Sequence, residues 1–216
     1  MRCVVFDLDG TLADTSADLL AAANACLPAP MLGPEDALCA FHGGRAMLRL
    51  GYSRLGQDWS EADVDAAYPV LLEAYGQAIA VHTRLYPGAM EAVEQLKSQG
   101  FAVSICTNKP AALAEELLRQ LGVRGAFDAM IGADTLPVRK PDPAPYVAAV
   151  ERAGGAVARS MLVGDTETDA KTGLAAGVPV ALVTFGPEGA GVSRFQPAVL
   201  LDRYEDLPDL AARLLR

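Results

Sequence analysis

The chain has 216 residues, of which 51% are hydrophobic and 21% charged, a composition typical of a globular protein with a full core. Its 18 lysines and arginines stand against 27 aspartates and glutamates, which gives a formal net charge of −9. Because the chain is acidic and has no clustered basic run, it is a poor candidate for nonspecific binding to nucleic acid or to an anionic membrane surface.

The four cysteines form no C-x-x-C pair and have no histidine at ligand spacing, so we expect neither a disulfide framework nor a zinc site. The chain starts directly with a strand pattern instead of a signal peptide. No apolar run reaches the roughly 18 residues that a membrane span needs. We therefore expect a cytoplasmic protein.

The first expected element is the apolar run CVVF at positions 3–6, whose length and β-branched residues predict a buried strand. The run DLDGTL follows at 7–12, and Gly10 ends the strand pattern. Asp7 and Asp9 therefore stand at the carboxyl end of a strand, where open α/β sheets bind their ligands. Two carboxylates so close together are costly unless a cation or a reaction needs them.

The next part of the chain, residues 15–82, contains only helical patterns and helix breakers and is expected to form an all-helical domain. Pro69 should bend or break the last of its four helices. The helices are expected around 19–23, from Pro34, after Gly43 and Gly44, and from Ser60.

From Leu85 onward short strands and helices alternate. This rhythm predicts an α/β domain, a parallel sheet with helices on both faces, formed by residues 1–14 and 83–216 around the helical insertion. Strands are expected at 101–106, 129–131, 161–163 and 180–183, and helices at 88–99, 111–121, 144–153 and 170–176.

Polar residues follow the later strands as well. Thr107 and Asn108 follow the strand at 101–106, Lys140 follows the connection after 129–131, and Asp165 and Asp169 follow 161–163. In a parallel sheet these ends converge on one edge. The set suits phosphoryl transfer, because carboxylates hold Mg²⁺, a lysine and a hydroxyl hold phosphate oxygens, and an aspartate can be a covalent nucleophile.

In this order the residues resemble the four motifs of the haloacid dehalogenase superfamily, in particular its aspartate-nucleophile phosphatases. DLDGTL at 7–12 matches the first motif, Thr107 the second, Lys140 the third, and Gly164-Asp165 with Asp169 the fourth. The insertion after the first motif resembles the helical cap of the group that holds phosphoglycolate phosphatases and β-phosphoglucomutases. The resemblance implies a Rossmann-like core with an inserted helical cap.

The resemblance also implies a role for each residue. Asp7 would be the nucleophile, and Asp9 would be the general acid for the leaving alcohol and then the base that activates water. Lys140 would bridge the Asp7 carboxylate and the phosphate. The remaining implied roles are Mg²⁺ binding and phosphate binding. The metal would be bound by Asp7, the Asp9 carbonyl and Asp165, with Asp169 supporting it directly or through water, and phosphate would be bound by Thr107 and Asn108.

Taken singly, these residues have ordinary structural interpretations. Asp7 and Asp9 could form a turn, although an EF-hand is excluded because its glycine stands at the sixth position and Gly10 stands at the fourth. Thr107 with Asn108 could cap a helix, and Asp165 with Asp169 could be acids at a helix N-terminus. The ordered set favours catalysis.

Residues in the helical domain should determine which leaving group the enzyme accepts. The segment Gly43-Gly44-Arg45 is the most suggestive, since glycines that open a helix expose N–H groups to an anion and Arg45 could pair with a carboxylate. Such a site suits 2-phosphoglycolate, in which one carbon joins a phosphate and a carboxylate. The other interpretation is a Gly-Gly loop with Arg45 in solvent.

We therefore expect a Mg²⁺-dependent phosphatase for a small phosphorylated metabolite, most simply 2-phosphoglycolate, acting as a monomer or homodimer. A sugar-phosphate phosphatase or a β-phosphoglucomutase-like mutase remains an alternative, because both keep Asp7 and Asp9. Asp9 disfavours a dehalogenase, and the lack of lysine between Asp14 and Thr83 disfavours a phosphonate hydrolase. A phospho-acceptor receiver domain would lack the helical insertion, and a non-catalytic binding relative has no missing catalytic residue to support it.

Overall fold

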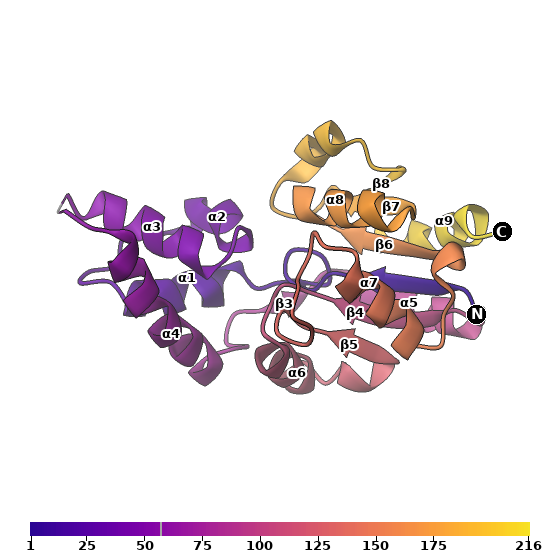
Figure 1. The fold of residues 1–216 in the computed structure, drawn as a ribbon, viewed down its shortest axis with the longest axis horizontal. Helices are drawn as coiled ribbons and strands as arrows, with labels where there is room; N and C mark the ends of the chain where they lie inside the picture. Colours follow the sequence, from indigo (N-terminus) through magenta and orange to yellow (C-terminus); the bar gives the residue numbers. More distant parts are fainter. Residues whose placement is uncertain (57) are drawn as a thin grey trace. The chain divides into compact units, whose positions relative to one another are not determined.

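The computed structural model describes residues 1–56 and 58–216. The chain divides into two compact units. Met1–Ala13 and Leu85–Arg216 form one, here the sheet unit, and Asp14–Arg84 form the other, here the helical unit (Figure 1). The expected division into 1–14 with 83–216 and 15–82 stays a prediction, from which these bounds differ by one or two residues at each join.

A six-stranded parallel sheet is the centre of the sheet unit, and it confirms the expected α/β fold. β1 lies in the middle between β4 and β6, so that Val5 stands opposite both Ser104 and Leu162 (Figure 1). The sheet order is β5 (Ala129–Ile131), β4 (Ala102–Cys106), β1 (Cys3–Phe6), β6 (Ser160–Gly164), β7 (Val180–Val183) and β8 (Val199–Leu201).

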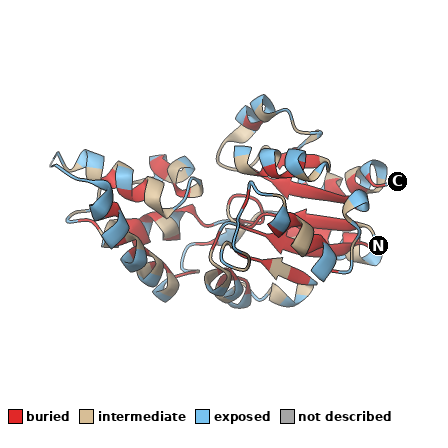
Figure 2. Cartoon of the chain, in the orientation of Figure 1, coloured by how far each residue is buried: buried red, intermediate tan, exposed pale blue. Residues whose placement is uncertain are grey.

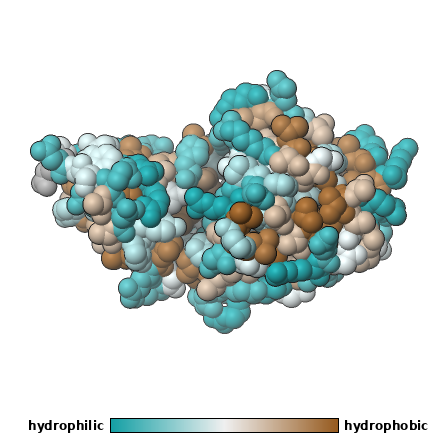
Figure 3. All heavy atoms as spheres, in the orientation of Figure 1, coloured by the Kyte–Doolittle hydropathy of each residue, from teal (hydrophilic) through white to brown (hydrophobic). Residues whose placement is uncertain are grey.

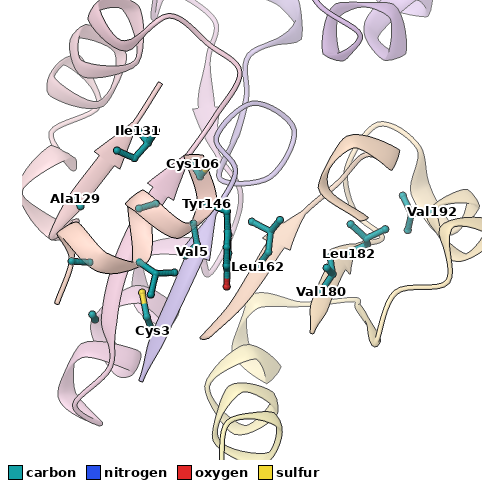
Figure 4. Close-up of a cluster of buried hydrophobic side chains, with 14 residues drawn as sticks. Cys3, Val5, Cys106, Ala129, Ile131, Tyr146, Leu162, Val180, Leu182 and Val192 are labelled. Atoms are coloured by element: carbon teal, nitrogen blue, oxygen red, sulfur yellow. The ribbon is translucent and has the colours of Figure 1, made fainter. Parts of the chain in front are cut away.

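Helices cover both faces of this sheet, and most strand residues are buried (Figure 2). On one face α7 (Ala144–Arg152) packs against β1, β4 and β5, and α8 (Glu167–Ala176) packs against β6 and β7. Figure 4 shows Tyr146 of α7 standing between Val5 and Leu162 in this core. On the other face Phe6 contacts Tyr204, with ring centroids 6.5 Å apart.

The sheet unit contains further helices and 3₁₀ turns around the sheet. α5 packs against β4 and against α9, a helix that was not predicted from the sequence. β8 was also not predicted. These elements are α5 (Ala89–Ser98), α6 (Ala111–Gln120), α9 (Leu207–Leu214) and the 3₁₀ turns η2 (Arg124–Ala126), η3 (Val157–Arg159), η4 (Gly189–Phe195) and η5 (Tyr204–Asp206).

A buried aspartate joins the start of the helical unit to its end. Asp18 in α1 accepts hydrogen bonds from the backbone N–H of His82, from the N–H of Thr83 at 2.8 Å and from the Thr83 hydroxyl at 2.7 Å, so the start and the end of the unit are joined. The helices are α1 (Ser16–Ala25), the 3₁₀ turn η1 (Pro34–Asp36), α2 (Ala37–Phe41), α3 (Gly44–Arg54) and α4 (Glu61–Gln77).

Of the bend or break expected at Pro69, the break is wrong, because α4 continues through it from Glu61 to Gln77. A proline inside a helix costs about 3 kcal/mol, and packing of the buried α4 face offsets this. That face consists of Val64, Ala67, Leu71 and Tyr75. The short strands β2 (Ala13–Asp14) and β3 (Arg84–Leu85) pair where the chain passes from one unit to the other.

The surface that Figure 3 shows is a mosaic of hydrophilic and hydrophobic residues. Within residues 1–56 and 58–216, no helix combines the length and the apolar character that crossing a bilayer demands.

Candidate active site

The catalytic candidates of the first motif lie where β1 ends in the middle of the sheet. The Asp7 N–H donates to the Val163 carbonyl at 2.9 Å, which fixes the start of the loop against β6. Gly10 has a φ of +80°, and its N–H donates to the Ala13 carbonyl at 2.9 Å. Because side chains other than glycine rarely adopt this conformation, Gly10 is what lets the chain turn directly after the two acids.

Lys140 is a buried cation of the site. Its ammonium lies 3.0 Å from Asp7 Oδ1 and donates to Asp169 Oδ1 at 2.6 Å. Burial alone would lower the pKa of Lys140, but the charges of Asp169 and Asp7 outweigh burial and hold the pKa above its ordinary value. Lys140 is therefore a permanent positive charge beside the predicted nucleophile.

Asp7 is destabilised as an anion despite this lysine. Burial, with a smaller contribution from the charges of Asp169 and Asp9, raises the pKa of Asp7 to about 6 although Lys140 opposes the increase. The Lys140 ammonium attracts Asp7 Oδ1 but is not aligned to donate to it, so this buried oxygen accepts no hydrogen bond from the described residues.

Asp165 follows β6, and only one of its two carboxylate oxygens is satisfied. Its Oδ1 accepts a hydrogen bond from the Thr11 hydroxyl at 2.7 Å, but Oδ2 is buried and has no donor among the described residues. Burial and the charges of Asp169 and Asp7 raise its pKa well above the ordinary value.

These carboxylates fit a divalent cation. One carboxylate oxygen from each of Asp7, Asp165 and Asp169 lies within 4.8 Å of the others. The two buried oxygens without a donor, on Asp7 and Asp165, are acceptors that a hard cation would satisfy. An all-oxygen donor set of this kind suits Mg²⁺ or a similar ion.

Asp169 differs from the other two acids because the protein already occupies both of its oxygens. It is the third residue of α8, and its Oδ2 accepts from the Thr166 hydroxyl at 2.7 Å and from the Thr166 N–H at 3.1 Å in a capping box. Its Oδ1 accepts from Lys140. Asp169 therefore anchors Lys140 and the loop that carries Asp165.

Thr107 and Asn108 lie at the end of β4, as expected. Thr107 is buried, its N–H donates to the Ile131 carbonyl at 2.9 Å, and its hydroxyl oxygen accepts from the Lys109 N–H at 3.1 Å. The Asn108 side chain donates to the Lys140 carbonyl at 3.0 Å. Asn108 thus ties the loop after β4 to the segment that carries Lys140, and its phosphate contact stays a prediction.

Two residues of the site were not predicted from the sequence. Lys109 donates to Asp9 Oδ1 at 2.7 Å, and Thr11 donates to Asp165. Lys109 follows Thr107 and Asn108 at the same strand end, and Thr11 stands inside the DLDGTL run, so the position of each at the sheet edge was the signal that could have found them.

The structure brings Asp7, Lys140, Asp165 and Asp169 together at the carboxyl edge of the sheet, and it pairs Asp9 with Lys109 there. The expected residues Gly43, Gly44 and Arg45 belong to the helical unit. Gly43, with a φ of +96°, precedes α3, and a side chain on Gly44 would meet the Tyr68 ring. Arg45 pairs with Asp65 and lies 4.7 Å from the centre of the Tyr68 ring.

A family model of haloacid dehalogenase-like hydrolases matches residues 1–177. The chain is 37% identical over 218 residues to a phosphoglycolate phosphatase of Mesorhizobium japonicum, covering 99% of this chain and 96% of the relative. It is 35% identical to a phosphoglycolate phosphatase of Agrobacterium fabrum, covering 98% and 93%. A crystal structure of a predicted phosphoglycolate phosphatase from Haemophilus somnus is similar with a TM-score of 0.84 at 25% identity, covering 97% of each chain. The chain therefore belongs to the haloacid dehalogenase-like hydrolases.

Proposed function

We propose that this protein hydrolyses 2-phosphoglycolate through an aspartyl-phosphate on Asp7. The protein is a phosphoric monoester hydrolase, as its family and its full-length relatives indicate. The observation that carries the proposed chemistry is the acid cluster, in which Asp7 and Asp165 each keep a buried oxygen without a donor among the described residues, beside the Lys140 ammonium.

In the first half of the reaction the Asp7 carboxylate attacks phosphorus and the bond from phosphorus to the ester oxygen breaks. Asp9 gives its proton to that oxygen, so glycolate leaves as an alcohol. In the second half Asp9 takes a proton from water and the water oxygen attacks phosphorus. The bond from phosphorus to the Asp7 oxygen breaks, so phosphate is released and the Asp7 carboxylate is regenerated. Asp7 and Asp9, which only one residue separates, would thus act as the nucleophile and as the acid and base.

We assign the metal site to the Asp7 carboxylate, the Asp9 carbonyl and Asp165, with Asp169 in a supporting role. A bound Mg²⁺ would supply positive charge that offsets repulsion between the Asp7 carboxylate and the phosphate dianion. The engagement of both Asp169 oxygens by Lys140 and Thr166 supports its placement as an anchor rather than a direct ligand.

Phosphate binding is assigned to Thr107, Asn108 and Lys140. Lys140 is held by Asp169 and attracted by Asp7, so its ammonium can stay with the nucleophile while it binds a phosphate oxygen. Such a cation offsets the negative charge that the two reacting groups bring together.

For the substrate, the relatives named phosphoglycolate phosphatase and the Gly43-Gly44-Arg45 segment are the support. Arg45 would pair with the substrate carboxylate by exchanging it for Asp65, its present partner. We further propose a cytoplasmic enzyme, a monomer or homodimer, and the four free cysteines are in keeping with a reducing compartment.

The test is phosphate release from a panel of esters with Mg²⁺: 2-phosphoglycolate, sugar phosphates, nucleotides and p-nitrophenyl phosphate. The highest kcat/KM should fall on 2-phosphoglycolate, and chelation of the metal should abolish activity. A higher kcat/KM for a sugar phosphate would reject the substrate, and full activity in metal-free buffer would reject the metal assignment.

A further inference from the structure

Lys109 is a second buried cation at the sheet edge, and the roles assigned above do not use it. Its side chain is only 4% exposed, and its ammonium donates to Asp9 Oδ1 at 2.7 Å. A buried ammonium is retained only where it has a charged partner, so Asp9 is what accounts for a lysine at this position. The two residues lie 100 positions apart in the sequence.

The backbone around Lys109 is fixed on both sides. Its N–H donates to the Thr107 hydroxyl at 3.1 Å, and its carbonyl accepts from the Ala133 N–H at 2.9 Å. Gly132 lies against the backbone of Ala111, where an added Cβ would be 2.5 Å from the Ala111 Cα, so the loop after β5 can approach the start of α6 only because position 132 has no side chain. The Lys109 side chain therefore extends from a backbone segment that hydrogen bonds and close packing hold in place.

The two lysines of the site divide the acids between them. Lys140 pairs with Asp7 and Asp169, while Lys109 pairs with Asp9. In the proposed function Asp7 is the nucleophile and Asp9 is the acid and base. Each of these two carboxylates is therefore paired with a different lysine. The Asp9 carboxylate is 18% exposed and stands on a loop, where its side-chain torsion needs an external constraint.

We propose that Lys109 is a positioning residue that orients the Asp9 carboxyl group for proton transfer to the leaving oxygen. This role rests on the proposed function. The Lys109 ammonium donates to Oδ1, and the transferred proton is carried by the other oxygen, so this hydrogen bond can persist while Asp9 changes from the neutral acid to the carboxylate. General acid catalysis demands hydrogen-bond geometry, and small displacements of the catalytic group are costly.

Positioning by Lys109 predicts a dependence on the leaving group. p-Nitrophenolate leaves without a proton, whereas the alkoxide of an alkyl phosphate does not. Lys109→Met should therefore lower kcat/KM for 2-phosphoglycolate by about 10-fold or more relative to kcat/KM for p-nitrophenyl phosphate, a part of the ~10²–10⁴-fold that a general acid contributes. Equal losses on both esters would overturn the proposal and make Lys109 a phosphate-binding or structural residue.

A double-mutant cycle with Asp9→Asn decides whether Lys109 acts through Asp9. Leaving-group release in a single turnover should fall little further when Lys109→Met is added to Asp9→Asn. Independent, additive losses would contradict positioning. Lys97→Met is the matched control, because it removes a lysine–aspartate pair of the same unit, with Asp128 at 2.8 Å, and it should leave the ratio between the two esters unchanged.

Thermal unfolding distinguishes positioning by Lys109 from a structural or a metal-binding role. The melting temperature is measured for each variant, and Lys109→Gln replaces Lys109→Met if the latter does not fold. The rise in melting temperature on adding Mg²⁺ should persist without Lys109, and its loss would assign Lys109 to the metal site instead. If the wild-type enzyme hydrolyses neither ester, the proposed function fails rather than the role of Lys109.

Discussion

Two buried aspartates, one in each unit, are satisfied in opposite ways. Asp18 of the helical unit accepts four hydrogen bonds from His82 and Thr83, whereas Asp165 of the sheet unit accepts one, from Thr11, and keeps a buried oxygen without a donor among the described residues. Since an unpartnered buried carboxylate destabilises a fold, its presence indicates a ligand or a reaction. Burial alone does not distinguish a catalytic acid from a structural one, but hydrogen-bond satisfaction does.

The ion pairs at the sheet edge and the two pairs that join α3 to α4 differ in the same direction. Lys140 with Asp169 and Lys109 with Asp9 are buried pairs between distant segments. In the helical unit Arg45 and Arg49 form exposed pairs with Asp65 and Glu61. Exposed pairs contribute little to stability and are easily exchanged for another partner, as the proposed role of Arg45 requires.

The largest expected effect is on the nucleophile. Asp7→Asn keeps the size of the side chain but removes the attacking carboxylate, so phosphate release should fall on the order of 10⁴-fold or more. Assays of phosphate release with Mg²⁺ and 2-phosphoglycolate measure it. Activity within a few-fold of wild type would rule out Asp7 as the nucleophile.

Asp18→Asn should damage the fold rather than the chemistry. The amide nitrogen would face N–H donors, and the charge-assisted bonds to Thr83 and His82 would be lost, which should lower the free energy of unfolding by about 2–4 kcal/mol and the melting temperature by about 5–15 °C. Thermal unfolding followed by circular dichroism tests this. An unchanged melting temperature would show that the hydrogen bonds of Asp18 do not hold the helical unit together.

Asp165→Asn should raise the melting temperature, whereas Asp18→Asn should lower it. The pKa of Asp165 is raised in the folded protein, so its ionisation destabilises the metal-free fold as pH rises above the pKa of the unfolded chain. The variant should therefore melt higher than the wild type at neutral pH without metal, by about 2–4 °C for each 1 kcal/mol gained.

The same Asp165→Asn variant should also lose the stabilisation that Mg²⁺ gives to the wild type. Melting temperatures with and without Mg²⁺ provide both results. A variant that melts lower than the wild type without metal, yet still responds to Mg²⁺, would argue against Asp165 as an unsatisfied metal ligand.

The smallest effect is expected in the exposed pairs. Arg45→Ala should raise KM for 2-phosphoglycolate more than KM for p-nitrophenyl phosphate, with little change in melting temperature. Arg49→Ala is the matched control, because it removes an equally exposed arginine pair from the same helix and should leave both KM values unchanged. Equal changes in KM for the two esters would remove Arg45 from substrate recognition.

Much of the sheet edge was predictable, because residues that follow parallel strands must converge there, as Asp7, Lys140 and Asp165 do. Lys109 and Thr11 were harder to assign, since their partners stand 100 and 154 positions away and no local pattern encodes such pairs. β8 has only three residues at the sheet edge, too few for periodicity to identify.

At Pro69 a local sequence pattern was present, but tertiary packing overrode it. Local chemistry predicted a bend or a break in the helix, but the packing of the buried face of α4 within the helical unit keeps the helix continuous. In the same way, Arg45 could be identified as a charge at a helix start, but its pairing with Asp65 and its position beside Tyr68 depend on how α3 and α4 meet.

The most direct measurement of the central claim is the site of phosphorylation in Asp9→Asn. This variant should still accept phosphate from p-nitrophenyl phosphate, whose leaving group needs no proton, but should hydrolyse the phosphoenzyme slowly. Acid quenching followed by peptide mass spectrometry should then find one phosphoryl group on Asp7. Phosphate on a different residue, or release of p-nitrophenolate in the first turnover with no phosphorylated peptide, would contradict Asp7 as the nucleophile.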